Sequence, residues 1–351
     1  NVRQIEGTVN KILAFQELMG ESVDVDTVTR AVRDMFKDKA DFLPSPDIII
    51  DDGASFARLA SLERPELTAN LIGVAEETTS GVRAFQQMQE AGALTYPVVA
   101  VNDSVLKTGF DNAHGTGETC VTTMQRILGE HAFDGKNVTV IGYGPVGQGF
   151  ARRIRALGAE GTIGDIDPGA SLKAVFDGFA AQDIDEALPC ADMVVSATGV
   201  RHTVTLEHMR AMHEGAALAV IGGIANEIAL DEVSDFTPQV NRDTVQLNVP
   251  DGPTLTLIAD GDGVNYTVGG GNPIEIMDLS FAVQASAVAY LLEHRGTLDH
   301  TLIRLDAATD QRIAASALKA RGYRASHAVE DNGYNWRLTR FAENDRENAD
   351  R

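Results

Sequence analysis

The sequence predicts an α/β fold of two domains, in which short buried strands alternate with helices. Runs of apolar and β-branched residues, such as 47–51 and 137–141, end in acidic or glycine residues and are separated by stretches with helical periodicity. A glycine-rich turn over residues 142–149 opens the second half of this pattern. The chain has 351 residues, more than one hydrophobic core usually serves, which favours two domains.

Composition excludes several classes of protein. The chain is 44% hydrophobic and 23% charged, which is ordinary for a soluble globular protein. A formal net charge of −22 argues against a nucleic-acid partner, because phosphates would be repelled. No apolar run approaches the roughly 18 to 20 residues of a membrane helix, so no membrane partner is expected. The two cysteines have no metal-ligand spacing, so we expect no metal site and a cytoplasmic location.

The first half of the chain begins with two stretches of helical spacing, residues 4–19 and 27–36. Three strands are then expected, over residues 47–51, 71–76 and 96–101, with a helix before the third. Each strand is followed by polar residues, and in a parallel sheet these would lie together at one edge.

Asp52, Glu77 and Asn102 stand at the ends of these three strands. In open α/β sheets, ligands bind outside the carboxyl ends of the strands. One such side chain alone would be an ordinary polar loop residue. Three in succession indicate a binding site.

Lys107 and Asp111 follow the third strand. If residues 103–114 are helical, these two side chains are i,i+4 neighbours on one face. From spacing alone, the more common arrangement is a solvent-exposed ion pair. The remainder of the sequence changes that interpretation.

The turn Gly142-Tyr-Gly144-Pro-Val-Gly147 follows a predicted strand and precedes a predicted helix. This is the context in which G-x-G-x-x-G binds a dinucleotide, since the glycines allow a tight turn and a close approach of the pyrophosphate. Asp165 ends the next strand and can accept the ribose 2′-hydroxyl. No arginine follows it directly, because Ile166 comes next, so the pattern favours NAD over NADP.

The second half continues this Rossmann-type alternation. We expect further strands over 161–164, 193–196, 217–221 and 254–259. A long apolar helix over 276–293 suits packing between domains or subunits. One more helix, 306–321, precedes a charged tail.

Together these stretches resemble the S-adenosylhomocysteine hydrolase family. The resemblance runs from about residue 20 to 293, in the same order and at similar spacing. The stretches that carry it are Asp51-Asp52-Gly53, Glu76-Glu77-Thr78-Thr79-Ser80-Gly81, Asn102 to Lys107, Asp111-Asn112, Gly142 to Gly149, Asp165 to Pro168, Ala197-Thr198-Gly199 and Val264-Asn265.

The resemblance implies a substrate domain over residues 1–112 and 271–305, an NAD-binding domain over 113–270 and a tail over 306–351. It also implies that NAD and a purine nucleoside bind between the domains, and that the protein is a homo-oligomer, either a tetramer or a dimer.

In that family a tightly held NAD oxidises the ribose 3′-hydroxyl, which acidifies the neighbouring C–H. The 5′ substituent is then eliminated, water adds, and the ketone is reduced again. By resemblance, Lys107 is the base at the 3′-hydroxyl, with Asp111 beside it. The positive nicotinamide nearby disfavours a charged lysine, as a base requires.

The site residues are assigned on the same grounds. The catalytic candidates are Asp52, Glu77, Lys107, Asp111, Asn112 and His114. The substrate candidates are Asp52, Glu77, Asn102, Lys107, Asp111, Thr116 and Asn272. The cofactor candidates are Thr78, Thr79, Ser80, Asn112, Gly142, Gly144, Pro145, Val146, Gly147, Asp165, Ile166, Ala197, Thr198, Gly199, Ile221, Gly222 and Asn265.

The sequence departs from the family at several positions. Thr116 stands where the family has a cysteine, residues 222–225 replace a Gly-His-Phe-Asp motif, and Asn272 replaces the histidine of a Gly-His-Pro hinge. The Lys- and Tyr-containing end of the family is not recognisable in residues 332–351. The redox residues are therefore retained, while those that handle water and the leaving group are altered.

Two histidines could compensate for the missing ones. His114 lies three residues after Asp111, and the alternative is an ordinary half-buried helix residue. His202 follows the Ala-Thr-Gly turn and is more typical of a loop.

The sequence is compatible with three functions. The protein is a dehydratase or lyase of nucleoside natural-product chemistry that stops at the alkene, a hydrolase of S-adenosylhomocysteine or S-inosylhomocysteine, or a regulatory homologue that binds NAD without catalysis. Retention of Lys107, Asp111, Glu77 and Asp52 argues against the third.

Overall fold

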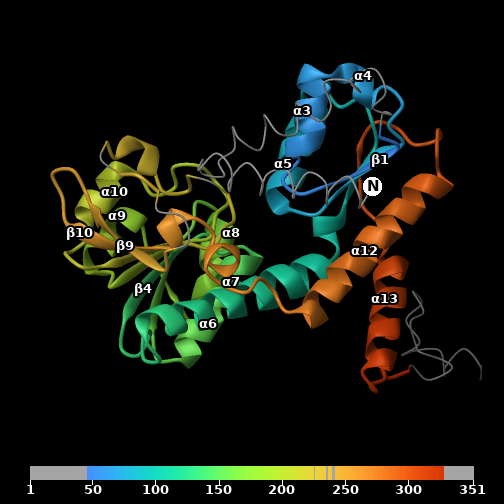
Figure 1. Cartoon of the computed structure of the whole chain (residues 1–351). Helices are drawn as coiled ribbons and strands as arrows, with labels where there is room; N and C mark the ends of the chain where they lie inside the picture. The colour runs from blue at the N-terminus through green and yellow to red at the C-terminus, as the bar shows by residue number, and fades with distance from the viewer. Residues whose placement is uncertain (1–45, 225, 235, 239–241, 328–351) are drawn as a thin grey trace, which may run out of the picture. The chain divides into compact units, whose positions relative to one another are not determined.

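The computed structural model describes residues 46–224, 226–234, 236–238 and 242–327 (Figure 1). The helices expected over 4–19 and 27–36, and the tail over 332–351, lie outside these residues. The described chain forms two compact units. The first ends at Ala100 and includes Val288–Ile303, and the second begins at Val101, runs to Ala287 and resumes at Arg304. The expected boundaries between a substrate domain and an NAD-binding domain, near residues 113 and 270, stay a prediction. So does the binding of ligands between those two domains.

The first unit contains a parallel four-stranded sheet in the order β1-β2-β3-β11. Its elements are β1 (Ile48–Asp51), α3 (Ser55–Glu63), α4 (Pro65–Thr68), β2 (Gly73–Glu76), α5 (Thr79–Glu90), β3 (Val98–Ala100) and β11 (Leu302–Ile303). Asp51 pairs with Glu76 in the sheet register, so the carboxyl ends of β1 and β2 lie at one edge. The three strands expected in this half of the chain are confirmed.

The second unit contains a seven-stranded sheet in the order β6-β5-β4-β7-β8-β10-β9, parallel except for β9. Its strands are β4 (Asn137–Ile141), β5 (Glu160–Gly164), β6 (Ala180–Ala181), β7 (Met193–Ser196), β8 (Ala217–Val220), β9 (Thr244–Asn248) and β10 (Thr254–Ile258). The central strands are buried on both faces, which explains their continuous apolar sequences. The predicted α/β class is confirmed, whereas β9 was not expected.

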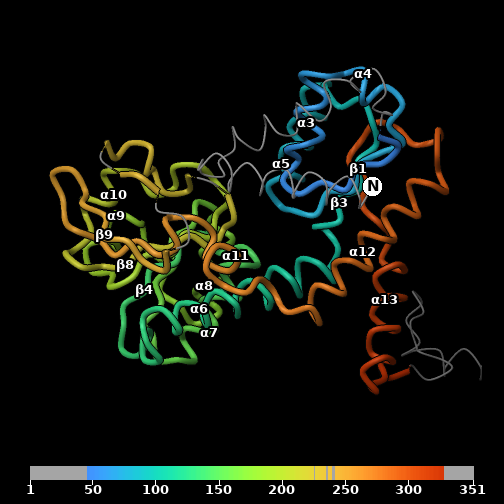
Figure 2. Tube along the Cα trace, in the orientation of Figure 1, coloured from blue at the N-terminus to red at the C-terminus, as the bar shows by residue number. Residues whose placement is uncertain are grey.

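Helices and short turns complete the second unit. They are η2 (Val101–Asp103), η3 (Lys107–Thr116), α6 (Gly117–Leu128), α7 (Pro145–Ala156), α8 (Pro168–Phe176), α9 (Ile184–Ala187), η4 (Leu188–Cys190), α10 (Leu206–Ala211), η5 (Leu230–Glu232), η6 (Ala259–Gly261), α11 (Val264–Thr267) and α13 (Ala307–Ala320). The Cα trace shows α6 and α7 side by side (Figure 2). A side chain at Gly149 would lie 1.8 Å from the carbonyl oxygen of Ala113, so α7 packs directly on the backbone of η3.

The long helix α12 (Ile274–Glu293) runs through both units. It is long and apolar enough to cross a membrane by length and composition, since an 18-residue stretch of it has a mean hydropathy of 1.3, and 33% of that stretch is buried. This corrects the expectation that no apolar run reaches that length. Because a core helix of a soluble protein meets the same criterion, the helix alone does not indicate a membrane. The expected homo-oligomer stays a prediction.

Candidate active site

The glycine-rich turn joins β4 to the N-terminus of α7. Gly142 has a φ of +96°, and a side chain at Gly147 would lie 2.0 Å from the carbonyl oxygen of Gly142. Both glycines are therefore required to close the turn. Gly144 is different, since a side chain there would meet nothing within 4 Å. The open position at a helix N-terminus fits the close approach of a pyrophosphate.

Asp165 and Asp167 both follow β5, and the structure distinguishes them. Asp167 caps α8 by accepting a hydrogen bond from the backbone N–H of Gly169 at 2.8 Å. Asp165 lies beside the glycine turn, where it accepts from the N–H of Tyr143 at 2.6 Å. Between them Ile166 is fully exposed. A carboxylate beside the glycine turn, next to an exposed apolar side chain, fits the expected adenosine half of a dinucleotide; ribose binding by Asp165 stays a prediction.

Tyr143, between the first two glycines, is anchored from outside the turn. Its hydroxyl donates to Asp177 at 2.9 Å, and Asp177 also accepts from Lys173 at 2.8 Å and from Arg152 at 3.1 Å. The hydrogen bond from Lys173, with that from Tyr143, holds the pKa of Asp177 well below its usual range. Burial, together with the bond to Asp177, raises the pKa of Tyr143.

Replacing Asp177 with Asn should lower the free energy of unfolding by about 1 kcal/mol at pH 7. A carboxylate whose pKa is lowered on folding stabilises the protein above its unfolded pKa of about 4 and loses that contribution as the pH falls. The difference between wild type and Asp177→Asn should therefore shrink below about pH 4, as measured by urea unfolding from pH 7 to 3. Asp299→Asn, at an exposed position, is the control and should show no such trend. A difference that stays constant with pH would contradict the expectation.

A buried carboxylate that the sequence analysis missed holds the end of β7. Glu227 is fully buried, and its Oε2 accepts from Ser196 Oγ at 2.6 Å and from the N–H and hydroxyl of Thr198 at 3.2 Å each. Burial raises the pKa of Glu227 against these hydrogen bonds. Thr198 is a cofactor candidate, so Glu227 fixes part of that edge. The sequence signal that could have identified Glu227 is an acidic residue inside the apolar stretch that follows β8.

Other cofactor candidates also lie around this sheet edge. Pro145 and Val146 are the first residues of α7. Ala197 and Gly199 follow β7, and Ile221 and Gly222 follow β8. The structure therefore brings the candidates of the glycine turn, β5, β7 and β8 to the carboxyl edge of one sheet. Such an edge is where open α/β sheets bind ligands.

Lys107 opens a π-helix, η3, rather than the expected α-helix. In a π-turn, residues i+4 and i+5 share the face of residue i. Lys107 Nζ accordingly lies 2.8 Å from Asp111 Oδ2 and donates to Asn112 Oδ1 at 2.7 Å. The three side chains are at most 8% exposed. The solvent-exposed ion pair suggested by spacing is therefore wrong, because this pair is buried.

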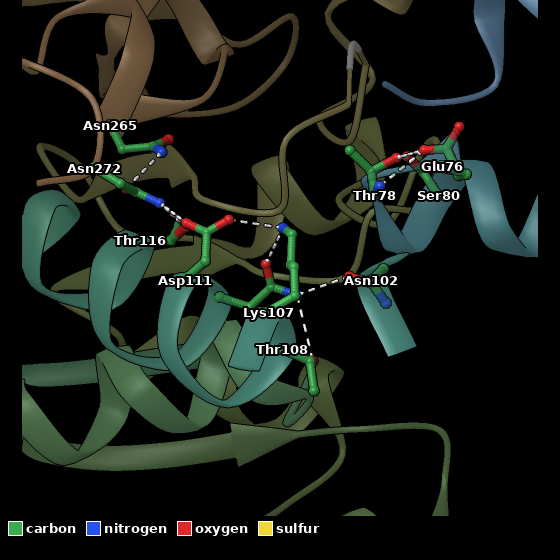
Figure 3. A network of polar contacts seen from close by, with 11 residues as sticks. Glu76, Thr78, Ser80, Asn102, Lys107, Thr108, Asp111, Thr116, Asn265 and Asn272 are labelled. Atoms are coloured by element: carbon green, nitrogen blue, oxygen red, sulfur yellow. Dashed lines mark hydrogen bonds and ion pairs between the residues drawn. The ribbon is translucent and has the colours of Figure 1, made fainter. Parts of the chain in front are cut away.

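The network extends from this helix in two directions (Figure 3). Asn112 Nδ2 donates to Asn102 Oδ1 at 3.0 Å. On the other side Asn272 Nδ2 donates to Asp111 Oδ1 and, at 3.1 Å, to Thr116 Oγ1. Asn272 Oδ1 accepts from Asn265 at 3.4 Å. The structure thus joins every candidate of the second unit that the sequence placed near the substrate.

The first unit holds the remaining candidates. Asp51 and Glu76 are buried and structural, since Asp51 accepts from the N–H of Ala57 at 2.8 Å and Glu76 accepts from the N–H groups of Gly53 and Ala54 at 2.9 Å each. Burial raises the pKa of Glu76.

The sequence neighbours of Asp51 and Glu76 are less buried. Asp52 is exposed, Glu77 is half-buried, and Thr78 caps α5 by accepting from the N–H of Gly81 at 3.1 Å. Thr79 and Ser80 begin α5. A part for Asp52 and Glu77 in catalysis stays a prediction.

Within the part of the chain that the structure describes, no contact joins His114 to the Lys107 network. Its side chain is exposed, and its ring lies 6.1 Å from that of Phe110, centroid to centroid. His202 instead pairs with Asp231 at 2.7 Å. A catalytic part for His114 stays a prediction.

Comparison with known proteins agrees with this arrangement. Residues 112–271 match the family described as S-adenosyl-L-homocysteine hydrolase, NAD binding domain. The chain is 38% identical over 288 residues to an adenosylhomocysteinase of Thermotoga maritima, covering 81% of this chain and 71% of the relative. It is 38% identical to that of Aeropyrum pernix, with coverage of 82% and 69%. The chain belongs to the S-adenosylhomocysteine hydrolase family.

Another relative is named for a different substrate. The S-inosyl-L-homocysteine hydrolase of Methanopyrus kandleri is 37% identical, covering 79% of this chain and 66% of the relative. The cofactor of this family member is NAD, and the residues of the glycine turn, with Asp165 and Ile166, fit it.

Proposed function

We propose that this protein is an NAD-dependent enzyme that transiently oxidises a ribose-type hydroxyl of an adenine nucleoside and eliminates the 5′ substituent. The observation that carries the proposal is the buried Lys107, held against Asp111 and Asn112 by a π-helix. Rare π-turns occur frequently at functional sites. The names of the relatives support the same chemistry.

Bound NAD supplies the oxidation of the 3′ carbon and its later reduction. In its neutral form, which the positive nicotinamide of bound NAD would favour, Lys107 Nζ takes the proton of the 3′-hydroxyl and returns it after reduction. Asp111 and Asn112 fix the direction of the amine, since both bond to the same nitrogen. Asn102 fixes Asn112 in turn, at 3.0 Å. All four side chains are nearly buried, so the proton transfer takes place away from bulk water.

We further propose that the reaction stops at the unsaturated nucleoside. Among the described residues, the hydrogen-bonded network around Lys107 consists of amides, hydroxyls and one carboxylate, and contains no imidazole. Addition of water to the alkene needs a group that moves a proton, and imidazole is the commonest such group near neutral pH. Gly223 and Asn272 stand where the family carries histidines.

Hydrolysis of S-adenosylhomocysteine or S-inosylhomocysteine is the second candidate, and the names of the relatives favour it. A purely regulatory role is less well supported. A protein that only binds NAD has no need of a buried, paired lysine, because burying a charge costs free energy unless it is compensated.

The product distinguishes the two enzymatic candidates. The NAD-loaded protein is incubated with S-adenosylhomocysteine or its inosyl analogue in ¹⁸O-water, and the nucleoside is analysed by mass spectrometry. A 4′,5′-unsaturated nucleoside without ¹⁸O is the expected result. Adenosine or inosine carrying ¹⁸O at the 5′ position would instead establish hydrolysis. Bound NAD that shows no new absorbance near 340 nm with any nucleoside would contradict both.

A further inference from the structure

The carboxylate of Asp111 is held at both oxygens by partners far apart in sequence. Oδ2 bonds Lys107 Nζ at 2.8 Å, four residues away. Oδ1 accepts from Nδ2 of Asn272, 161 residues later in the chain. Asp111 is only 4% exposed, so water does not compete for these bonds. Rotation of the carboxylate would break one of them, and its direction is therefore fixed.

The chemistry of the neighbours determines which way the Asn272 amide points. An ionised carboxylate only accepts hydrogen bonds, so the amide nitrogen must face Asp111. The same nitrogen donates to Thr116 Oγ1 at 3.1 Å, and the amide oxygen accepts from Asn265 Nδ2 at 3.4 Å. Both amide hydrogens are thus engaged within the protein, as Figure 3 shows.

Gly115 makes the space that Asn272 occupies. A Cβ at position 115 would lie 2.9 Å from Asn272 Nδ2, 3.0 Å from its Cγ and 3.2 Å from its Cβ. The backbone of Gly115 does not have a positive φ, so glycine is needed here for room and not for conformation. Gly109 lies in the same π-helix, but a Cβ there would meet only Val105, at 3.7 Å, an ordinary contact.

We propose that Asn272 is a positioning residue that directs the Asp111 carboxylate onto Lys107, and that Gly115 is the notch which admits it. Asn272 acts through Asp111 and does not itself contact the substrate. This departs from the expectation, drawn from the sequence, that Asn272 is a substrate residue. The kinetic part of the proposal rests on the proposed function, because it is read from the reduction of bound NAD by a nucleoside.

The kinetic test uses Gly115→Ala, which displaces Asn272 without removing any polar group. The rate of NAD reduction at saturating nucleoside should fall about 10- to 100-fold, as expected when a reacting group is misplaced by about 1 Å. The half-saturating concentration of nucleoside should not change. Gly109→Ala, the matched control in the same helix, should react like wild type. Asn272→Ala should be as slow as Gly115→Ala.

The double variant adds a sharper test. Gly115→Ala with Asn272→Ala should be little slower than Asn272→Ala alone, because the two closest contacts of the added methyl are with the amide nitrogen and carbon that alanine lacks, and only the 3.2 Å contact with the Cβ of residue 272 remains. A raised half-saturating concentration at an unchanged maximal rate would make Asn272 a substrate contact and overturn the proposal. Equal slowing by Gly109→Ala would also overturn it, since the cause would then be the helix as a whole.

Thermal unfolding without ligand keeps the two proposals apart. Gly115→Ala should lower the Tm in the wild-type background and should lower it much less in the Asn272→Ala background, where only the contact with the Cβ of residue 272 remains. A Tm loss that persists in full in the Asn272→Ala background would show that Gly115 does not make room for Asn272, whatever the activity. If the wild-type protein reduces no NAD with any nucleoside, but the variants show the expected Tm pattern, the proposed function is overturned. The contact between Asn272 and Gly115 is then still established.

Discussion

Replacing Lys107 with Arg should slow the nucleoside-dependent reduction of bound NAD by about 10²- to 10⁴-fold. Arginine keeps the positive charge that the buried Asp111 carboxylate needs, but it does not lose a proton at accessible pH and so does not serve as a base. The rate is followed at 340 nm after mixing the NAD-loaded protein with a nucleoside.

The control for this variant is Lys136→Arg, the same exchange at an exposed ion pair with Asp192 at 3.6 Å. It should react like wild type. A third variant, Lys107→Met, should lose the reaction and also about 3–5 kcal/mol of unfolding free energy, because it leaves the Asp111 carboxylate buried and uncompensated. Retention of the wild-type rate within a few-fold by Lys107→Arg would remove Lys107 from the role of base.

Alanine at two glycines of the same turn should have opposite consequences. Gly147→Ala should destabilise the NAD-free protein by about 3 kcal/mol, because its Cβ would lie 2.0 Å from the carbonyl oxygen of Gly142. Gly144→Ala should leave that stability unchanged, since its Cβ would meet nothing within 4 Å and its φ is −71°. Gly144→Ala should instead weaken NAD binding by about 100-fold or more, because the methyl group takes the place through which the pyrophosphate approaches the backbone.

The two variants are compared by thermal unfolding without NAD and by fluorescence titration with NAD. Each variant is the control for the other, since both introduce one methyl group within three residues. Wild-type affinity in Gly144→Ala would show that the pyrophosphate does not lie over this turn. An undiminished Tm in Gly147→Ala would show that the turn can open.

Local sequence patterns predicted the elements of the second unit well. β4, β5, β7, β8 and β10 lie within one or two residues of their expected ranges, because buried parallel strands are continuous apolar runs bounded by turn residues. The dinucleotide turn is equally local, since its spacing places the glycines, the helix N-terminus and Asp165 in fixed relation.

The pair of Lys107 and Asp111 has features that local sequence patterns did not predict. Spacing placed the two side chains on one helical face, but it did not indicate their burial or the π-turn that adds Asn112 to the same nitrogen. A π-helix is not favoured by local propensity and persists where packing supports it. Here α7 packs on the backbone of η3 at Ala113, which no pattern in residues 103–114 reveals.

Local patterns in the sequence were enough to predict the α/β class, the dinucleotide turn and NAD as the cofactor, and to nominate Lys107 and Asp111 for the proposed redox step. The long-range contacts came from the tertiary structure: Asp165 accepts from the N–H of Tyr143 in the glycine turn, Glu227 bonds Ser196 at the end of β7, and Asn272 reaches Asp111 across 161 residues. The physical reason is the distance along the chain over which each kind of interaction acts. Periodicity and turn chemistry act over a few residues, whereas the partner of a buried polar atom is set by the packing of elements that are distant in the chain.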